Sequence, residues 1–338
     1  MSSYCKDKVA VVTGAGGTLC GPIAVDLVRK GAKVVLIGRT AAKLEATREA
    51  IVAAVSANGQ DARCPSGGDV NGQDARCPRE GGRVTGATGV SPVGGARAGA
   101  TGVPPVARCP DEYVRIETAS VTDEPAIQAI ADRVAAEWGP CRFLVNGAGG
   151  NQPPAVADRL QFDPAELSGR MADGKKGWWD VDLKVFESVL MTNTMGTIIP
   201  SRVFAKQMAA AGGGAIINFG SMNTYRPLTR VAAYAMSKAA IANWTQFLAQ
   251  YLAPAKIRVN AIAPGFFVND RSRKILCTPE GGLTARGEQV MAHTPARRFG
   301  EAKELLGCVD WLLDEEKSGF VTGITVPVDG GFLASAGV

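Results

Sequence analysis

Three side chains in the stretch Ser221–Lys238 (SMNTYRPLTRVAAYAMSK) could together move a proton: Ser221, Tyr234 and Lys238. In a helix, Tyr234 and Lys238 lie on one face, because residues four apart are neighbours on a helix surface. The ammonium beside the phenol favours the phenolate and lowers a pKa that is about 10 in water. A tyrosine tuned in this way exchanges protons near neutral pH, and Ser221 can hydrogen-bond the same reacting oxygen. This chemistry interconverts an alcohol and a ketone, with the hydride carried by a cofactor.

A tyrosine–lysine pair at this spacing also arises by chance, so the interpretation depends on the elements that would position it. The chain begins with a β-branched run at 8–13, a glycine-rich turn (GAGGTLCG) and a helical pattern that stops at Gly31. Strand, glycine turn and helix are the context that a dinucleotide site requires. Glycines let the backbone approach the pyrophosphate, and the helix N-terminus faces its negative charge. The candidate residues of this turn are Gly14, Gly16, Gly17, Thr18 and Leu19.

The residue after the second expected strand usually selects the cofactor. An acidic residue there binds the ribose hydroxyls of NAD, whereas this chain has Gly38, Arg39 and Thr40. Arg39 can pair with a 2′-phosphate, and no carboxylate at this position repels that group. We therefore expect NADP(H). NAD(H) is the alternative if Arg39 only stacks on the adenine or faces solvent.

Strand and helix patterns alternate along the rest of the chain. This alternation predicts an α/β fold: a doubly wound parallel sheet of the Rossmann type, in three αβα layers. The whole chain, 1–338, is expected to be a single domain because no linker divides it. Strands are expected at 8–13, 33–37, 113–118, 141–145, 215–219, 258–262 and 324–328. Helices are expected at 40–55, 124–138, 183–211 and 303–313, and from the Tyr234/Lys238 pair to residue 252.

The segment 58–110 departs from this pattern. It contains NGQDARCP twice, from Asn58 and Asn71, and the pair GATGVSPV and GATGVPPV repeats at the same period of thirteen. A segment with almost no large apolar residues cannot bury a core. We therefore expect a disordered, Gly/Pro/Ala/Arg-rich surface insertion.

A second glycine turn, Asn146–Gly150 (NGAGG), follows the fourth expected strand. Since the carboxyl ends of parallel strands meet at one edge, both glycine turns should line the same cleft. The polar segment 151–182 comes next, with Trp178 and Trp179 near its end. It either covers the substrate or is a surface loop whose tryptophans pack on the core. Residues 266–300 are expected to form a mobile lid.

Composition narrows the class of protein. The chain is 46% hydrophobic and 20% charged, and its net charge of +5 is not gathered in a basic run, which argues against nucleic-acid binding. Without an apolar signal segment or a membrane-length apolar run, the cytoplasm is the expected location and no membrane partner is expected. The eight cysteines form no CxxC pair and His293 is the only histidine. This argues against a metal site, a disulfide scaffold and a Ser-His-Asp triad.

Together these motifs resemble those of the short-chain dehydrogenase/reductase family. The resemblance covers nearly all of the chain outside 58–110 and rests on TGAGGTLCG, NGAG, NTMGT, YAMSK and APG. It implies that Tyr234 is the general acid/base, and that Lys238 lowers its pKa and binds the nicotinamide ribose. It also implies that Ser221 orients the carbonyl and that Asn193 holds a water in the proton path. Further implied cofactor contacts are Asn146, Ala148, Gly149, Pro264, Gly265, Phe267 and Asn269.

Several positions depart from the usual family pattern. The first turn commonly reads TGxxxGxG, but Thr18 and Cys20 replace its later two glycines. Both replacements are small, so we expect the turn to survive with altered phosphate contacts. The second Asn of NNAG is Gly147, the Asp near the adenine is Ser120, and the Thr that follows the PG motif is Asn269.

Within the family, the chain is most similar to the branch of D-mannonate oxidoreductases (fructuronate reductases). The similarity rests on NGAGGN, SMN, RPLT, APGFFV, AHTPARRFG and TVPVDGGF. This branch implies a sugar-acid substrate reduced at a ketone, and a carboxylate needs a cationic or polar clamp. Candidates near the cleft are Asn151, Asn223, Arg226, Arg271 and Arg273, each of which could equally be a solvated side chain or a subunit contact.

Two alternatives remain open from the sequence. The first is the same chemistry on another carbonyl, such as a 3-oxoacyl thioester or a polyol. The second is a dinucleotide-binding regulator without catalysis, which predicts damage among the four catalytic positions; all four are present. The expected partner is a small-molecule carbonyl or alcohol. The resemblance also implies a homo-oligomer, a tetramer or dimer, with GITVPVDGGF (323–332) as its contact.

Overall fold

Seven parallel strands form one sheet in the order β3-β2-β1-β4-β5-β6-β7. The computed structural model describes residues 4–57, 110–168 and 173–335, without the side chains of residues 57, 270 and 271. Its strands are β1 Val9–Thr13, β2 Lys33–Gly38, β3 Val114–Thr118, β4 Cys141–Asn146, β5 Gly214–Phe219, β6 Ile257–Pro264 and β7 Thr325–Val328. All seven expected strands are thereby confirmed. The central ones are continuous buried runs, as is typical of parallel sheets covered on both faces.

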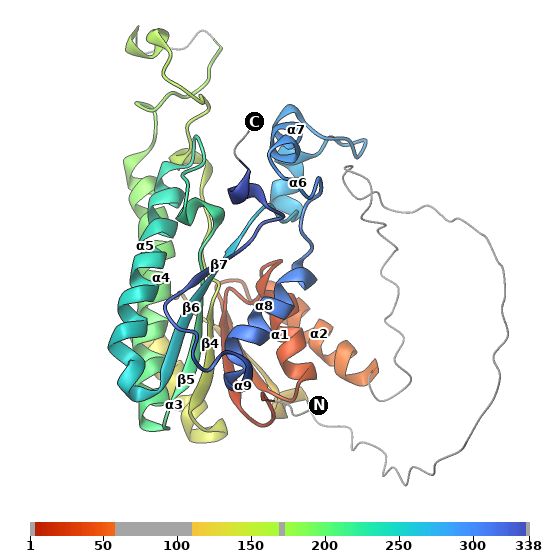
Figure 1. Cartoon of the computed structure of the whole chain (residues 1–338), viewed down its shortest axis with the longest axis vertical. Helices are drawn as coiled ribbons and strands as arrows, with labels where there is room; N and C mark the ends of the chain where they lie inside the picture. Colours follow the sequence, from red (N-terminus) through yellow and green to blue (C-terminus); the bar gives the residue numbers. More distant parts are fainter. Residues whose placement is uncertain (1–3, 58–109, 169–172, 336–338) are drawn as a thin grey trace, which may run out of the picture.

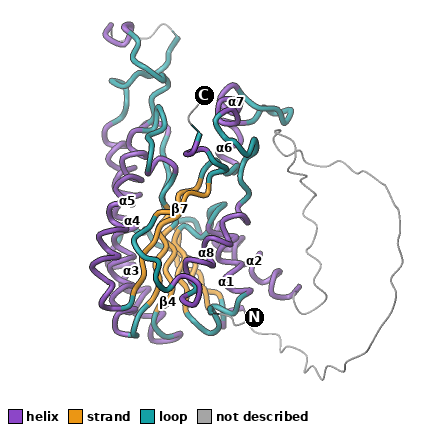
Figure 2. Tube along the Cα trace, in the orientation of Figure 1, coloured by secondary structure: helices purple, strands orange, loops and turns teal. Residues whose placement is uncertain are grey.

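Helices cover both faces of this sheet (Figures 1 and 2). One face carries α1 (Cys20–Arg29) and α8 (Leu306–Leu313), with α2 (Ala41–Ala57) packed beside α1. The other carries α3 (Glu124–Trp138), α4 (Leu183–Ala210) and α5 (Ala232–Leu252). Each face buries its own apolar core. The expected doubly wound, three-layer αβα fold is confirmed, and the described residues form one domain.

Short polar residues set the starts of the long helices. The side chain of Asp123 accepts a hydrogen bond from the amide of Ala126 at the start of α3. Asp182 accepts from the amides of Lys184 and Val185 at the start of α4. These bonds satisfy amides that a helix cannot pair internally, and they fix where each helix begins. None of the described helices is long and apolar enough to cross a membrane.

The strand order reverses between β1 and β4, and the chain crosses from one face of the sheet to the other at this point. A doubly wound sheet binds its ligands at the carboxyl edge beside such a reversal. Both glycine turns follow these two strands, as expected. The segment 58–110, expected to be disordered, lies outside the described residues except for Pro110.

The described residues of 151–182, which we call the arm, project beyond the carboxyl edge of the sheet (Figure 1). The arm is organised by the buried carboxylate of Glu166, which accepts hydrogen bonds from the amides of Asp163 (3.1 Å) and Trp178 (3.0 Å). The ring of Trp178 contacts Phe186 of α4 edge-on, yet Trp178 is 46% exposed and Trp179 is 61% exposed. The tryptophans therefore lie on the surface of the arm and not in the core.

The segment 266–300, which we call the flap, is folded rather than irregular. It contains α6 (Asp270–Leu276) and α7 (Ala285–Ala292), and its ends meet at the bridge between Phe267 and Gly300. A small apolar cluster of its own includes Leu276. The mobility expected of this segment stays a prediction. The helix expected at 303–313 is divided into a 3₁₀ turn, Ala302–Leu305, and α8.

Candidate active site

Ser221 lies at the carboxyl end of β5, where it caps the short 3₁₀ turn η4 (Met222–Thr224). Its Oγ accepts hydrogen bonds from the backbone and side-chain amides of Asn223, both at 3.2 Å. Two accepted bonds fill the acceptor positions of the oxygen, so its proton is left to donate. The hydroxyl of Tyr234 lies near this oxygen: burial raises the pKa of Tyr234, and the nearby Ser221 lowers it by a smaller amount. The fold thus brings Ser221 and Tyr234 together.

Lys238 lies one turn after Tyr234 on the same face of α5. Its Nζ is 5.5 Å from the centre of the tyrosine ring and donates a 2.6 Å hydrogen bond to the carbonyl of Phe219. Burial lowers the pKa of Lys238 to about 8. Burial also raises the pKa of Tyr234, against the opposing effect of Ser221. The structure therefore differs from the expected lowering of the tyrosine pKa, because burial dominates and Phe219 engages the ammonium.

Asn193 is fully buried in α4 and braces the second glycine turn. Its Oδ1 accepts from the amide of Gly150 (3.0 Å), while its Nδ2 donates to the carbonyls of Gly150 and Val189, both at 2.8 Å. Both N–H donors of this side-chain amide are thereby used, and its oxygen accepts one hydrogen bond. An added Cβ at Gly149 would lie 2.4 Å from Asn193 Oδ1 and 3.7 Å from Lys238 Nζ. Asn193 and Lys238 thus both lie against Gly149 of this turn; a role of Asn193 toward a water stays a prediction.

The two glycine turns are joined to each other. The buried hydroxyl of Thr13 accepts hydrogen bonds from the amides of Gly147 (3.1 Å) and Ala148 (3.2 Å). Gly14 has φ +66°, and an added Cβ would lie 2.8 Å from the nitrogen of Ala148. Only glycine fits there, on grounds of both conformation and space. Sequence reasoning missed Thr13, whose position at the end of β1 was the available signal.

Two departures from the family pattern are in direct contact. An added Cβ at Gly147 would lie 2.0 Å from Sγ of Cys20. The thiol is fully buried, and burial raises its pKa to about 12. Cys20 stands where the family has glycine, and Gly147 where it has a larger residue. The larger residue at position 20 therefore fills the space left by the smaller residue at position 147, and α1 stays packed against the second glycine turn.

The first glycine turn fits a pyrophosphate. An added Cβ at Gly16 would lie 2.7 Å from Cβ of Lys43, and one at Gly17 would lie 3.0 Å from a carbonyl oxygen of the same turn. Among the described residues, no backbone carbonyl accepts from the amides of Thr18 or Leu19 at the start of α1. Unpaired amides at a helix N-terminus, with no side chain in front of them, suit an anionic group.

A cleft of about 490 Å³ extends from this turn along the carboxyl edge. It is lined by both glycine turns, by Ser120 and by Arg39 and Lys43 from the start of α2. No carboxylate lines it, and none among the described residues forms an ion pair with either cation. Sequence reasoning identified Arg39 but missed Lys43, which contacts Gly16 only through the fold.

Asn146 lies beneath this cleft and does not line it. It is 1% exposed, and its Nδ2 donates to Ser201 (2.8 Å) and to Asn218 (2.9 Å). Asn218 in turn donates to Thr245 of α5 at 3.0 Å. These buried bonds tie β4 and β5 to α4 and α5. Of the candidates in this turn, Ala148 and Gly149 line the cleft and Asn146 supports it.

The candidates after β6 lie at the base of the flap. An added Cβ at Gly265, which follows Pro264, would lie 2.6 Å from Cα of Asp329. Phe267 is 9% exposed. Asn269 Oδ1 accepts from the amide of Ser272 (2.9 Å) and so caps α6. Contacts of these residues with a nicotinamide stay predictions.

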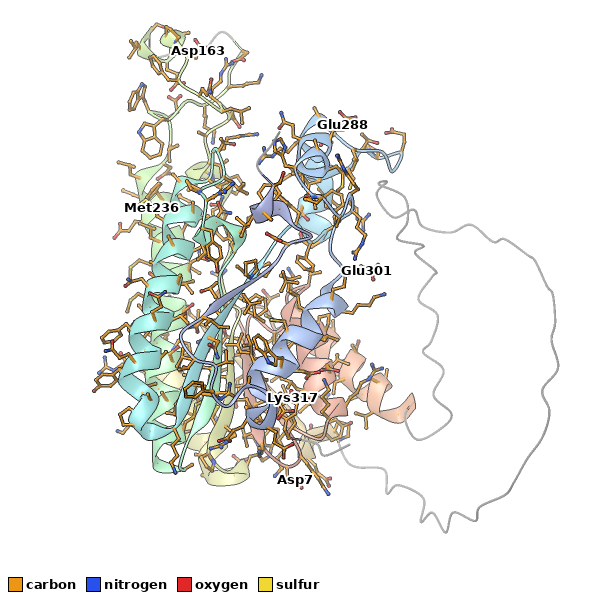
Figure 3. The ribbon with its side chains drawn as sticks, in the orientation of Figure 1. Asp7, Asp163, Met236, Glu288, Glu301 and Lys317 are labelled. Atoms are coloured by element: carbon orange, nitrogen blue, oxygen red, sulfur yellow. The ribbon has the colours of Figure 1, made fainter. Side chains whose placement is uncertain are left out.

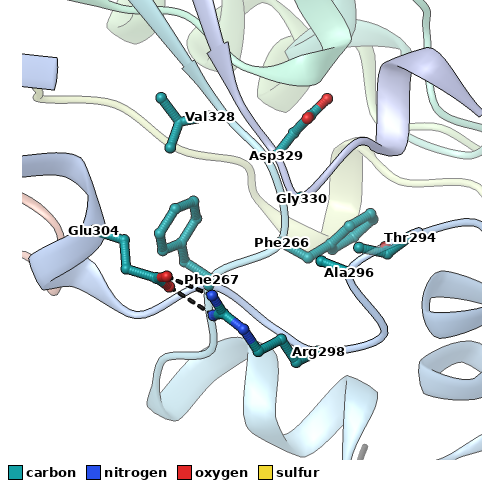
Figure 4. Close-up of a pocket in the computed structure, with 10 residues that line it drawn as sticks. Phe266, Phe267, Thr294, Ala296, Arg298, Glu304, Val328, Asp329 and Gly330 are labelled. Atoms are coloured by element: carbon teal, nitrogen blue, oxygen red, sulfur yellow. Dashed lines mark hydrogen bonds and ion pairs between the residues drawn. The ribbon is translucent and has the colours of Figure 1, made fainter. Parts of the chain in front are cut away.

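A second, smaller cavity of about 110 Å³ lies behind the flap (Figure 4). Phe266, Phe267 and Gly330 are among its lining residues, as are Arg298 and Glu304, which form an ion pair. Its ten lining residues include none of the four catalytic candidates. We therefore regard it as a packing cavity of the flap base, separate from the active site.

The substrate candidates divide into two groups. Asn223 lies in the site, where it holds Ser221 and accepts from the amide of Leu228 at 2.8 Å. Asn151 follows the second glycine turn, and its Oδ1 is used by the amide of Gln152. The second group consists of arginines: Arg226 and Arg273 are exposed, and the side chain of Arg271 lies outside the description.

No metal cluster is formed within 4–57, 110–168 and 173–335, where no three His, Cys, Asp or Glu side chains are grouped to hold an ion. His293 ends α7 in an exposed position, with Nδ1 2.8 Å from the carbonyl of Gln289. The recorded side-chain contact of His293 is thus with its own helix and not with Ser221 or Tyr234.

Comparison with known proteins identifies the family. A family model described as enoyl-(acyl carrier protein) reductase matches residues 96–333. The uncharacterized oxidoreductase UxuB of Bacillus subtilis is 35% identical over 331 residues, which is 98% of this chain and 96% of that one. The 2-dehydro-3-deoxy-D-gluconate 5-dehydrogenase of Escherichia coli is 31% identical over 218 residues, 64% of this chain and 75% of that one.

A solved structure gives a similar picture. It belongs to a protein of Haemophilus influenzae assigned as a D-mannonate oxidoreductase, with bound NAD. It aligns with 98% of this chain and 97% of its own at 32% identity, with a TM-score of 0.75. The chain therefore belongs to the short-chain dehydrogenase/reductase family, oxidoreductases that use a nicotinamide dinucleotide.

Proposed function

We propose that this enzyme interconverts a ketone and a secondary alcohol on a sugar acid of the D-mannonate/fructuronate type. The observation that carries the proposal is the Ser221–Tyr234 pair beside buried Lys238, at the edge that carries the dinucleotide cleft. Two relatives support the substrate class, because the names of both, the D-mannonate oxidoreductase and the 2-dehydro-3-deoxy-D-gluconate 5-dehydrogenase, refer to sugar acids.

The proton chemistry follows from the hydrogen bonds. Burial keeps the hydroxyl of Tyr234 protonated near neutral pH, so it is ready to protonate a carbonyl oxygen during reduction. Ser221 has one proton to donate, and it can bind the same oxygen because Asn223 fixes its acceptor side. Bound dinucleotide would supply the hydride. After Tyr234 gives up its proton, the positive charge of Lys238 nearby stabilises the phenolate that is left.

For the cofactor we favour NADP(H). Arg39 and Lys43 line the adenosine end of the cleft with no carboxylate between them, which suits a 2′-phosphate. The NAD in the similar solved structure keeps NAD(H) as the alternative. Arg39→Asp should reverse the ratio of kcat/KM for NADPH and NADH in favour of NADH. An unchanged ratio in Arg39→Asp and in Lys43→Gln would exclude both side chains from cofactor selection.

The test of the substrate is oxidation of NADPH or NADH by the purified protein with fructuronate, tagaturonate, 5-ketogluconate and a short 3-oxoacyl thioester. Turnover of a keto sugar acid supports the proposal. Turnover of the thioester alone would keep the mechanism and discard the sugar acid. Tight cofactor binding without turnover of any substrate would favour the non-catalytic regulator.

We also propose a homo-oligomer. Within the described residues, β7 is an edge strand of the sheet. The helix α5 exposes Phe247 and Tyr251, whose rings stack at 5.9 Å. Edge strands and exposed apolar patches are usually covered by partners. Light scattering of the purified protein should give the mass of a dimer or tetramer; a monomer at micromolar concentration would contradict this.

A further inference from the structure

The turn that carries Ser221 is bonded to the catalytic helix. The 3₁₀ turn η4 packs against α5, and Met236 marks that helix near its start in Figure 3. The hydroxyl of Thr224 accepts a hydrogen bond from the amide of Ser221 (3.2 Å) and donates to the carbonyl of Lys238 (3.0 Å). An added Cβ at Gly220 would lie 2.8 Å from the same hydroxyl oxygen. These contacts fix the backbone of Ser221 relative to α5.

The side chain of Asn223, in the same turn, is held at both ends. It is 5% exposed. Its Oδ1 accepts a 2.8 Å hydrogen bond from the amide of Leu228, and its Nδ2 donates to Oγ of Ser221 at 3.2 Å. A backbone amide can only donate, so the atom that faces Leu228 must be the oxygen, since the opposite orientation would set two donors against each other. The amide of Leu228 thus determines which end of Asn223 faces Ser221.

This orientation determines how the hydroxyl of Ser221 can bond. A serine hydroxyl has two lone pairs and one proton. Both lone pairs accept from Asn223, one from its backbone amide and one from Nδ2, each at 3.2 Å. The proton is therefore the part of the hydroxyl that is left to bond a reacting oxygen.

A hydroxyl held in this way suits one role in the reaction. It can donate to a carbonyl oxygen, and it donates more strongly as that oxygen gains negative charge during reduction. It cannot accept the proton of an alcohol, because it has no free lone pair. During reduction the O–H bond of Tyr234 breaks and a new O–H bond forms on the substrate. In the opposite direction the alcohol proton returns to the phenolate of Tyr234, and Ser221 keeps its own proton throughout.

We propose that Asn223 is a positioning residue that makes Ser221 a hydrogen-bond donor only, so that Tyr234 alone exchanges a proton with the substrate. The inference rests on the ketone–alcohol chemistry proposed above, and it holds for any carbonyl substrate. It gives Asn223 a role different from the substrate contact considered from the sequence. The sequence did not reveal this role, because the hydrogen bond from Leu228 depends on the path of the loop.

The experiment is a double-mutant cycle of Asn223→Asp and Ser221→Ala. Aspartate has nearly the shape of asparagine, and one of its oxygens can still accept from Leu228. Its other oxygen accepts where Nδ2 donated, so it draws the proton of Ser221 away from the substrate. Each single substitution should lower kcat by about 10²-fold, the magnitude of losing one donor to a reacting oxygen, with KM changed less than about threefold. Added to Ser221→Ala, Asn223→Asp should change kcat by less than about threefold, because no hydroxyl remains to be turned.

The kinetics are measured with whichever of the carbonyl compounds named above the wild type reduces. Asn223→Ala removes the side-chain donor without adding an acceptor, so it should lose less activity than Asn223→Asp although it removes more atoms. The matched control for the charge is Asn243→Asp, at an exposed position of α5, which should equal wild type.

The outcomes separate this inference from the proposed reaction. If Asn223→Asp lowers kcat equally with and without Ser221→Ala, its effect does not act through Ser221, and the inference is overturned. A KM that rises in both backgrounds would make Asn223 a substrate contact and would overturn it as well. A Ser221→Ala enzyme as active as wild type, or absence of turnover of every carbonyl compound, would overturn the proposed reaction together with this inference.

Discussion

At the scale of single residues, the proposed reaction depends on the hydroxyl of Tyr234. Tyr234→Phe keeps the ring that packs on Ala155 and Val189 and removes only the proton donor. We expect kcat to fall by about 10² to 10⁴ with cofactor affinity unchanged. Tyr225→Phe is the matched control, since its hydroxyl donates to the carbonyl of Thr325. Steady-state kinetics measure both variants. If Tyr234→Phe were as active as this control, Tyr234 would not be the proton donor.

The contact between Cys20 and Gly147 predicts a coupling between two substitutions. Gly147→Ala alone should destabilise the fold by about 1 to 3 kcal/mol, because the new methyl group overlaps Sγ of Cys20. In the Cys20→Ala background the same change should cost about 1 kcal/mol less, since the sulfur is gone. Urea denaturation of the four proteins in the cycle measures this coupling. Additive effects would show that the two departures from the family pattern are unrelated.

We expect that Lys238 lowers the stability of the fold although the proposed reaction requires it. Lowering the pKa of Lys238 from 10.5 to about 8 corresponds to roughly 3 kcal/mol of destabilisation at neutral pH. Lys238→Met should therefore be inactive yet more stable at pH 7 by about 2 kcal/mol, the lost hydrogen bond to Phe219 offsetting the rest.

Proton binding by Lys238 determines how the stability difference between wild type and Lys238→Met changes with pH. Between pH 8 and 10.5 the unfolded wild type holds a proton on Lys238 that the folded protein lacks, so wild-type stability rises with pH relative to the methionine variant. The difference in unfolding free energy should shrink across this range in parallel urea titrations. A constant difference would mean that the folded lysine is charged throughout.

At the scale of elements, the arm depends on one carboxylate. Glu166→Ala removes the acceptor for the amides of Asp163 and Trp178 and should loosen the arm while the sheet stays intact. We expect faster hydrogen exchange in 158–180 and a Tm within about 2 °C of wild type, because the sheet contributes most of the buried contacts. Exposed Glu49 of α2 provides a control, Glu49→Ala. Unchanged exchange in the arm would show that other contacts define it.

The elements themselves were largely predictable from local patterns. The β-branched runs, the glycine turns and the caps at Asp123 and Asp182 determine strands and helices through contacts near in sequence. The flap was not predicted as helical, because α6 and α7 are short and have a small core of their own. The position of the arm tryptophans was also open, since a polar segment does not reveal which side of a ring meets the core.

The candidate site was also predictable where its residues are related by contacts near in sequence. Spacing placed Tyr234 and Lys238 on one face, and the order of motifs indicated Ser221. Thr13 and Lys43 were missed because each acts through a segment distant in sequence. The pKa of Tyr234 was also beyond sequence reasoning, since burial outweighs the neighbouring ammonium and burial is a property of the folded chain.

At the scale of the whole molecule, one edge of the sheet carries every part of the proposed chemistry. The dinucleotide cleft, the Ser221–Tyr234 pair, the arm and the flap all lie at the carboxyl ends of the strands (Figure 1). This is the edge at which a doubly wound sheet binds ligands. The proposed reaction is therefore expected to place a hydride on a carbon held at this edge, beside the dinucleotide cleft.

The most direct test of the central claim follows that hydride. Fructuronate is reduced with NADPH or NADH carrying deuterium on the transferable position of the nicotinamide, and the product is analysed by mass spectrometry. Our account predicts mannonate with one deuterium on the former ketone carbon, formed by wild type and lost in Tyr234→Phe. Product without deuterium at that carbon, or equal labelling by Tyr234→Phe, would contradict it.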